Sequence, residues 1–145
     1  MQSGPSTVEV RAMFKSFAVV AGSYVLSIVL VLATDPLLSR LFPGEYVRGH
    51  VPSNSPLIAS TAAFIFISIF CAWLCAYFAP SRPGSHVLWF LIIGEVMGVA
   101  TAIPNWTNGW PHWYYLSWLF SWPVSCWIGL RLAKRRTNAI STAVG

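Results

Sequence analysis

Hydrophobic residues fall into four long runs, separated by three shorter polar segments. The runs cover residues 14–34, 57–79, 86–103 and 113–133. A helix needs about 20 such residues to cross the hydrocarbon core of a bilayer. The third run is the shortest, so its helix should extend into the flanking turns or stand steeply in the membrane. The pattern predicts an all-α fold: a four-transmembrane-helix bundle that forms a single integral membrane domain over residues 1–145.

The first run has a second interpretation, as a secretory signal peptide. Arg11 precedes it and Lys15 lies at its start, and Val31-Leu32-Ala33 resembles a small-residue cleavage site. The apolar part of a signal peptide is usually about 7–15 residues long. Because this run is longer, the sequence favours a retained membrane anchor.

The longest polar segment covers residues 35–56 and is predicted to be an outer loop. Asp35-Pro36 is typical of a helix start, with Asp as the N-cap and Pro at the first helical position. A short interfacial helix is therefore expected over residues 36–42, ended by Pro43-Gly44. The other two linkers cover residues 80–85 and 104–112.

Basic residues are distributed unevenly between the two sides of this predicted bundle. The first and third linkers carry only Arg40 and Arg48. The N-terminus, second linker and C-terminus together carry seven: Arg11, Lys15, Arg82, Arg131, Lys134, Arg135 and Arg136. Since cytoplasmic segments are enriched in Lys and Arg, both termini are expected in the cytoplasm. An interfacial aromatic belt is expected at the outer side, formed by Trp106, Trp110, Trp113, Tyr114 and Tyr115.

Composition excludes a water-soluble domain. Hydrophobic residues make up 56% of the chain and charged residues 9%, against about 25% charged in a typical soluble domain. The net charge of +5 does not indicate nucleic-acid binding, because four of the nine basic residues cluster in the last fifteen positions. Basic clusters beside an apolar helix indicate topology and contact with anionic lipid. The three cysteines lie inside apolar runs, where thiols are usually small fillers. We expect no metal and no cofactor.

Glu95 is a carboxylic acid inside the third apolar run. Ionisable residues at bilayer depth are costly and are functional-site hypotheses by default. The runs contain no central Lys or Arg to pair with it, so we expect a neutral carboxyl at rest. The neutral candidates to bind it are serines: Ser23, Ser27, Ser68, Ser117, Ser121 and Ser125. Glu95 is predicted either to lock two helices by hydrogen bonding or to carry a proton or cation.

Small residues near Glu95 predict close helix packing. Gly94 and Gly98 form a GxxxG motif, and Gly22 ends a matching small-residue stripe in the first run. These glycines are predicted to pack helices within one subunit or, alternatively, at a dimer face. Pro123 lies near the middle of the fourth run, where it is expected to kink the helix because it lacks an N–H donor.

Three segments resemble a large group of uncharacterised bacterial four-helix membrane proteins. They are Phe17-Ala18-Val19-Val20-Ala21-Gly22-Ser23-Tyr24, Trp110-Pro111-His112-Trp113-Tyr114 and Gly129-Leu130-Arg131-Leu132-Ala133. The resemblance implies a bacterial cytoplasmic (inner) membrane location and no known activity.

No enzymatic motif accompanies these features. The leading function is a structural or accessory membrane protein whose partners are the lipid bilayer and either further copies of itself or another membrane protein, without nucleic acid. The alternative is a small proton- or cation-coupled transporter or channel that works through Glu95.

Overall fold

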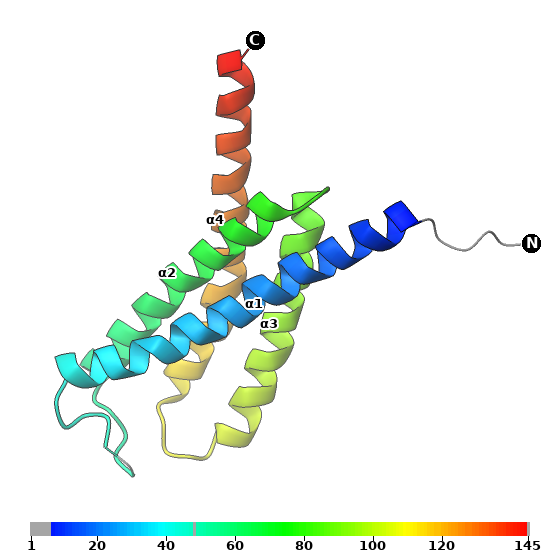
Figure 1. The fold of residues 1–145 in the computed structure, drawn as a ribbon. Helices are drawn as coiled ribbons and strands as arrows, with labels where there is room; N and C mark the ends of the chain where they lie inside the picture. Colours follow the sequence, from blue (N-terminus) through cyan, green and yellow to red (C-terminus); the bar gives the residue numbers. More distant parts are fainter. Residues whose placement is uncertain (1–6, 48, 145) are drawn as a thin grey trace, which may run out of the picture.

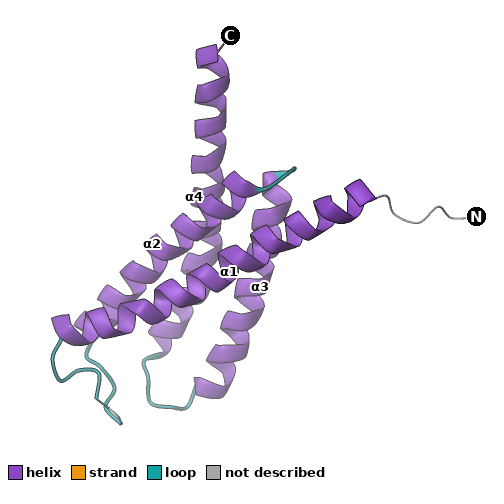
Figure 2. Cartoon of the chain, viewed as in Figure 1, coloured by secondary structure: helices purple, strands orange, loops and turns teal. Residues whose placement is uncertain are grey.

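The described residues of this computed structural model, 7–47 and 49–144, form four helices (Figures 1 and 2). They are α1 (Thr7–Leu41), α2 (Asn54–Phe78), α3 (Pro83–Asn105) and α4 (His112–Val144). Three of them, α1 to α3, are long and apolar enough to cross a membrane, which indicates an integral membrane protein. The all-α prediction is confirmed. α4 is not among these three spans because Trp, Tyr and Ser residues dilute its aliphatic content.

Successive helices run in opposite directions, so the described ends of the chain lie at one end of the bundle (Figure 1). The two longer connections, at residues 42–53 and 106–111, lie together at the opposite end (Figure 2). Residues of both connections line a shared surface hollow. The apolar runs predicted this alternation, because a bundle of four antiparallel spans needs only short links.

The predicted helix break at Asp35-Pro36 is wrong. α1 continues through both residues to Leu41, so the outer loop is shorter than the predicted residues 35–56. Pro36 removes one backbone N–H, and the helix continues beyond it: the N–H of Phe42 still donates to the carbonyl of Leu38 at 2.8 Å. The chain turns at Pro43-Gly44, where Gly44 has a φ of +88° that favours glycine. Arg48 lies outside the described residues.

α2 is the central helix. It contacts α1, α3 and α4, whereas the described parts of α1 and α4 do not pack against each other (Figure 1). The buried core joins small residues of α2 to one large aromatic from each of α3 and α4. Its main members are Cys71, Ala72, Cys75, Ala76, Phe90, Trp122, Cys126 and Ala133. The cysteines act here as buried fillers between helices.

α2 and α4 approach each other closely at Gly129. A Cβ added there would lie 2.6 Å from the Ile69 carbonyl oxygen and 2.8 Å from the Trp73 backbone nitrogen. Small residues let membrane helices approach until their backbones touch. Gly129 was not among the glycines that the sequence singled out, although Ala133 one turn further on repeats the small-residue spacing.

The Glu45 carboxylate ties the loop between α1 and α2 to the start of α2. The backbone N–H of Ser53 donates to Oε2 at 2.7 Å and the Ser53 hydroxyl to Oε1 at 3.1 Å; His50 Nε2 lies 3.7 Å from Oε2. These contacts, chiefly the backbone hydrogen bond, lower the pKa of Glu45 below its ordinary value. They also explain why Ser53, the N-cap of α2, makes no side-chain cap bond to its own helix.

This contact predicts a pH-dependent loop. A carboxyl whose pKa is lowered by folding favours the folded loop above its ordinary pKa, and that contribution is lost as pH falls through the lowered value. We expect the Ser53 amide resonance in NMR spectra to titrate with a midpoint below that of an ordinary glutamate. Glu45→Gln should abolish the titration. A midpoint at the ordinary value would contradict the hydrogen bond.

Candidate functional site

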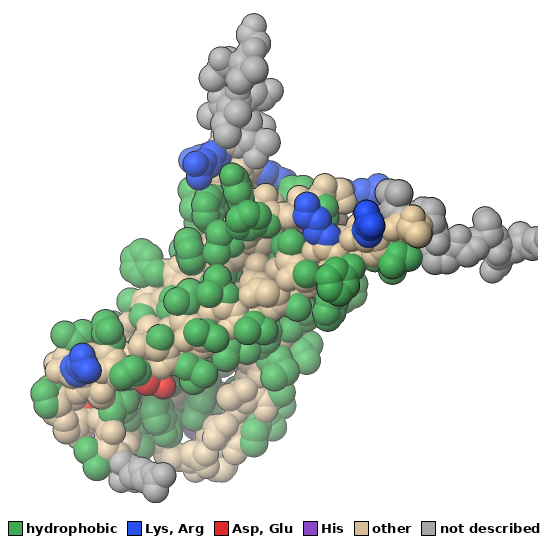
Figure 3. All heavy atoms as spheres, in the orientation of Figure 1, with side chains coloured by type: hydrophobic (Ala, Val, Ile, Leu, Met, Phe, Trp, Pro, Cys, Tyr) green, Lys and Arg blue, Asp and Glu red, His purple; other side chains and the backbone are tan. Residues whose placement is uncertain are grey.

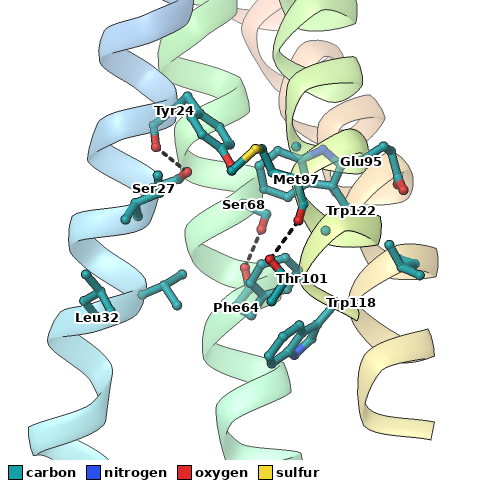
Figure 4. Close-up of a pocket in the computed structure, with 15 residues that line it drawn as sticks. Tyr24, Ser27, Leu32, Phe64, Ser68, Glu95, Met97, Thr101, Trp118 and Trp122 are labelled. Atoms are coloured by element: carbon teal, nitrogen blue, oxygen red, sulfur yellow. Dashed lines mark hydrogen bonds between the residues drawn. The ribbon is translucent and has the colours of Figure 1, made fainter. Parts of the chain in front are cut away.

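Glu95 lies on α3 at its boundary with α4. Figure 4 shows its carboxyl on the opposite side of α3 from Tyr24 and Ser27 of α1. The side chain is half-buried, and its Oε1 is shielded from solvent without a hydrogen-bond partner among the described residues. A buried polar atom without a partner is costly, and the cost grows in a medium as apolar as a bilayer. The described chain therefore leaves one carboxyl oxygen of Glu95, inside the candidate membrane span α3, without a hydrogen-bond partner.

Gly94 and Gly98 both face α4, on the flank of Glu95. A Cβ on Gly94 would overlap the indole ring of Trp122, and one on Gly98 would lie 3.1 Å from Leu119 Cδ2. The Trp122 Nε1–H donates to the Leu91 carbonyl of α3 at 3.1 Å. The GxxxG motif thus seats an aromatic side chain of the same subunit.

Gly22 is placed differently. A Cβ there would meet nothing within 4 Å, so it makes no close approach inside the described chain, and a role at a dimer face stays a prediction. The Pro123 kink also stays a prediction; the helical assignment of α4 continues through this residue.

A cavity of about 310 Å³ opens between the helices beside this site (Figure 4). Its walls are mainly apolar and aromatic, with hydroxyls from Tyr24, Ser27, Ser68 and Thr101. Ser27, Ser68 and Thr101 donate to the carbonyls of Tyr24, Phe64 and Met97 on their own helices, at 2.7, 2.6 and 2.8 Å. These hydroxyls are therefore already engaged.

None of the serines proposed as partners is hydrogen-bonded to Glu95 in the described structure. Ser117 and Ser121 also donate to their own helix, at 2.7 and 3.3 Å. Hydroxyls in membrane helices satisfy themselves locally in this way. The sequence does not indicate this, because a serine hydroxyl can donate either to a carbonyl of its own helix or to a group on a neighbouring helix.

The described histidines and cysteines form no metal-binding group of three with Asp or Glu. His50 faces Glu45, and His112 stacks on Trp106 with ring centroids 4.3 Å apart. His86 is buried at the start of α3, with Nδ1 3.3 Å from the Arg82 carbonyl oxygen and Nε2 without a partner in the described chain. The sequence did not single out His86 as more than a boundary residue.

Fold and site indicate a helical integral membrane protein with a carboxylic acid inside the candidate membrane span α3, at its boundary with α4. No protein-family model, curated protein or solved structure matches the chain. Function is therefore inferred below from the geometry of the site.

Proposed function

We propose that the chain is a structural membrane protein with four membrane spans and with both termini in the cytoplasm. It self-associates through the exposed face of α3 that includes Glu95. The observation behind this proposal is that the described chain gives Glu95 Oε1 no hydrogen-bond partner. Because Oε1 is shielded in the single chain, the half-buried carboxyl must turn outward to meet a second copy. A neutral carboxyl both donates and accepts one hydrogen bond, so two copies related by a two-fold axis would satisfy each other.

The remainder of the α3 face suits such an interface. Val96 is 61% exposed in the single chain, and the same stripe continues with Ile92, Val99 and Ile103, all exposed. The described chain offers no Lys or Arg at this depth, which favours a second copy over internal pairing. Interhelical hydrogen bonds and close apolar packing are the forces that associate helices in lipid.

The distribution of charge supports the proposed orientation. Most Lys and Arg side chains in this view gather at the end of the bundle that carries both chain ends. Acidic side chains appear at the opposite end, where Arg40 in the last turn of α1 also lies (Figure 3). α4 completes the fourth span in this proposal. Its Trp and Tyr residues lower its hydropathy, yet membrane interfaces are enriched in these residues.

Topology can be tested by thiol labelling of intact cells. The three native cysteines are fully buried, so they can stay in place. We expect Asn108→Cys, on the exposed outer connection, to react with a membrane-impermeant maleimide. Ser81→Cys, on the exposed α2–α3 turn, should react only after permeabilisation. Labelling of position 81 alone in intact cells would invert the proposed orientation.

Substitution of Glu95 tests self-association. Glu95→Gln keeps a group that both donates and accepts, so the dimer should persist. Glu95→Leu should weaken the dimer roughly tenfold or more, because each interhelical hydrogen bond contributes about 0.6–2 kcal/mol and the pair forms two. The measurement is native mass spectrometry over a protein dilution series in mild detergent.

Crosslinking locates the interface. A thiol-specific crosslinker should join Val96→Cys chains into dimers, and should not join Val29→Cys chains, whose cysteine lies on the exposed face of α1. Monomeric wild-type protein with no Val96→Cys dimer would contradict the proposal.

The cavity beside Glu95 supports a second candidate, a proton- or cation-coupled transporter. In that case Glu95→Gln should keep the fold and abolish transport, because an amide cannot ionise. Growth complementation by the wild-type, Gln and Leu proteins separates the two functions. A stable dimer with full function in the Gln protein eliminates the transporter.

A further inference from the structure

A second cavity, of about 370 Å³, lies at the outer end of the bundle and has an unusual wall. Five aromatic side chains and one carboxylate contribute to it: Phe64, Trp110, Tyr114, Tyr115, Trp118 and Asp35. The rings form one connected cluster. Tyr114 meets Trp118 edge-on at 4.5 Å between centroids and stacks on Trp110 at 5.6 Å, and Tyr115 meets Trp118 edge-on at 6.0 Å.

This cluster differs from the interfacial belt that the sequence predicted. Belt residues face lipid headgroups, whereas Tyr114 is only 6% and Tyr115 only 5% exposed. Their hydroxyls are held in place: Tyr114 bonds Ser60 at 2.9 Å, and Tyr115 donates to the Asn105 carbonyl at 3.2 Å. The rings are therefore fixed around the cavity.

One charged group in the wall is left without a partner. Asp35, whose side chain is exposed, makes no hydrogen bond or ion pair within residues 7–47 and 49–144. A carboxylate and aromatic rings that line one cavity attract a cation with an apolar surface. Aromatic rings stabilise positive charge, and an alkylated ammonium is less strongly hydrated than a primary one.

We propose that this cavity binds an alkylated ammonium group, with Asp35 as its counter-charge. The cavity of about 310 Å³ beside Glu95 is its deeper neighbour, and the two share Val31, Phe64, Thr101 and Trp118. Figure 4 shows Trp118 and Phe64 at the outer end of that deeper cavity. An apolar tail attached to the ammonium enters there, so the ligand class is an amphiphilic organic cation. The ammonium subsite is lined by Asp35 and not by Glu95, and it does not depend on self-association.

Calorimetric titration of the full chain in dodecyl maltoside tests the proposal. Choline is the probe, and 3,3-dimethylbutanol, its uncharged carbon isostere, is the matched control. Choline should bind at least tenfold more tightly than the isostere. Hexyltrimethylammonium should bind more tightly than choline, because its tail reaches the apolar neighbour.

The protein controls are Asp35→Asn and Glu45→Gln. Each substitution removes one carboxylate at the same end of the molecule, from α1 at Asp35 and from the following loop at Glu45. Only Asp35 lines the cavity. Asp35→Asn should weaken hexyltrimethylammonium binding at least tenfold with an unchanged melting temperature, and Glu45→Gln should leave binding unchanged. Equal binding of choline and its isostere, or equal loss in both variants, would overturn the proposal.

The alkylated ammonium can come from a choline lipid headgroup or from a free amine. Nanodiscs of phosphatidylcholine and phosphatidylglycerol distinguish these sources, with Asp35→Asn subtracted as the background in each. Weaker hexyltrimethylammonium binding in the choline lipid identifies the headgroup as a competing occupant and supports the site. Equal binding in both supports a free amine as its ligand. Binding that Asp35→Asn does not change in either disc overturns the proposal.

Discussion

Gly129→Ala is expected to destabilise the bundle more than any other single-methyl addition at a glycine. The new Cβ would meet the Ile69 carbonyl, the Trp73 backbone nitrogen and Ala72 Cβ at 2.6–2.8 Å. Backbone atoms cannot rotate aside, so α2 and α4 must separate along their shared interface. Overpacking of this kind costs about 1–3 kcal/mol or more. We expect a melting temperature lower by roughly 3–10 °C in detergent, measured by circular dichroism.

Gly22→Ala is the matched control for this prediction. It makes the same chemical change in a helix, at a position where a Cβ would meet nothing within 4 Å. Alanine also has the higher helix propensity, so this variant should be neutral or slightly stabilised. Equal melting temperatures for the two variants would show that α2 and α4 are not in backbone contact at Gly129.

Trp122→Ala is expected to be the most destabilising side-chain truncation in the core. Trp122 is 5% exposed, lies over Gly94, and has ring centroids 4.9 Å from Phe90 and 5.8 Å from Phe64. Truncation would open a large cavity and remove the hydrogen bond to Leu91, at a cost of about 3–5 kcal/mol. The measurement is again the melting temperature. Trp127→Ala, on the same helix but 55% exposed, should change it far less.

A double-mutant cycle isolates the contact with α3. Gly94→Ala should destabilise the wild type because the new methyl overlaps the Trp122 ring. In a Trp122→Phe background the smaller ring should tolerate that methyl, so the two effects should not add. Additive effects would mean that Trp122 does not seat on Gly94.

The sequence by itself determined the membrane class and the alternation of the helices. Run length and the scarcity of charge are sufficient for this, because a bilayer core leaves the backbone few options besides the helix. The predicted helix break at Asp35-Pro36 was wrong because a proline near a helix end removes only one backbone N–H donor. The helical turns on both sides of it still form.

Tertiary structure alone decided which small residues matter and which polar groups remain free. Gly94 and Gly22 look alike in sequence, yet only Gly94 faces a neighbouring side chain, because that depends on how α3 and α1 are rotated about their axes. Likewise, an intramembrane Glu95 was evident from the sequence. The nearby serines donate to carbonyls of their own helices, so Glu95 is left without a partner. The sequence does not indicate this, because only packing fixes the side-chain directions.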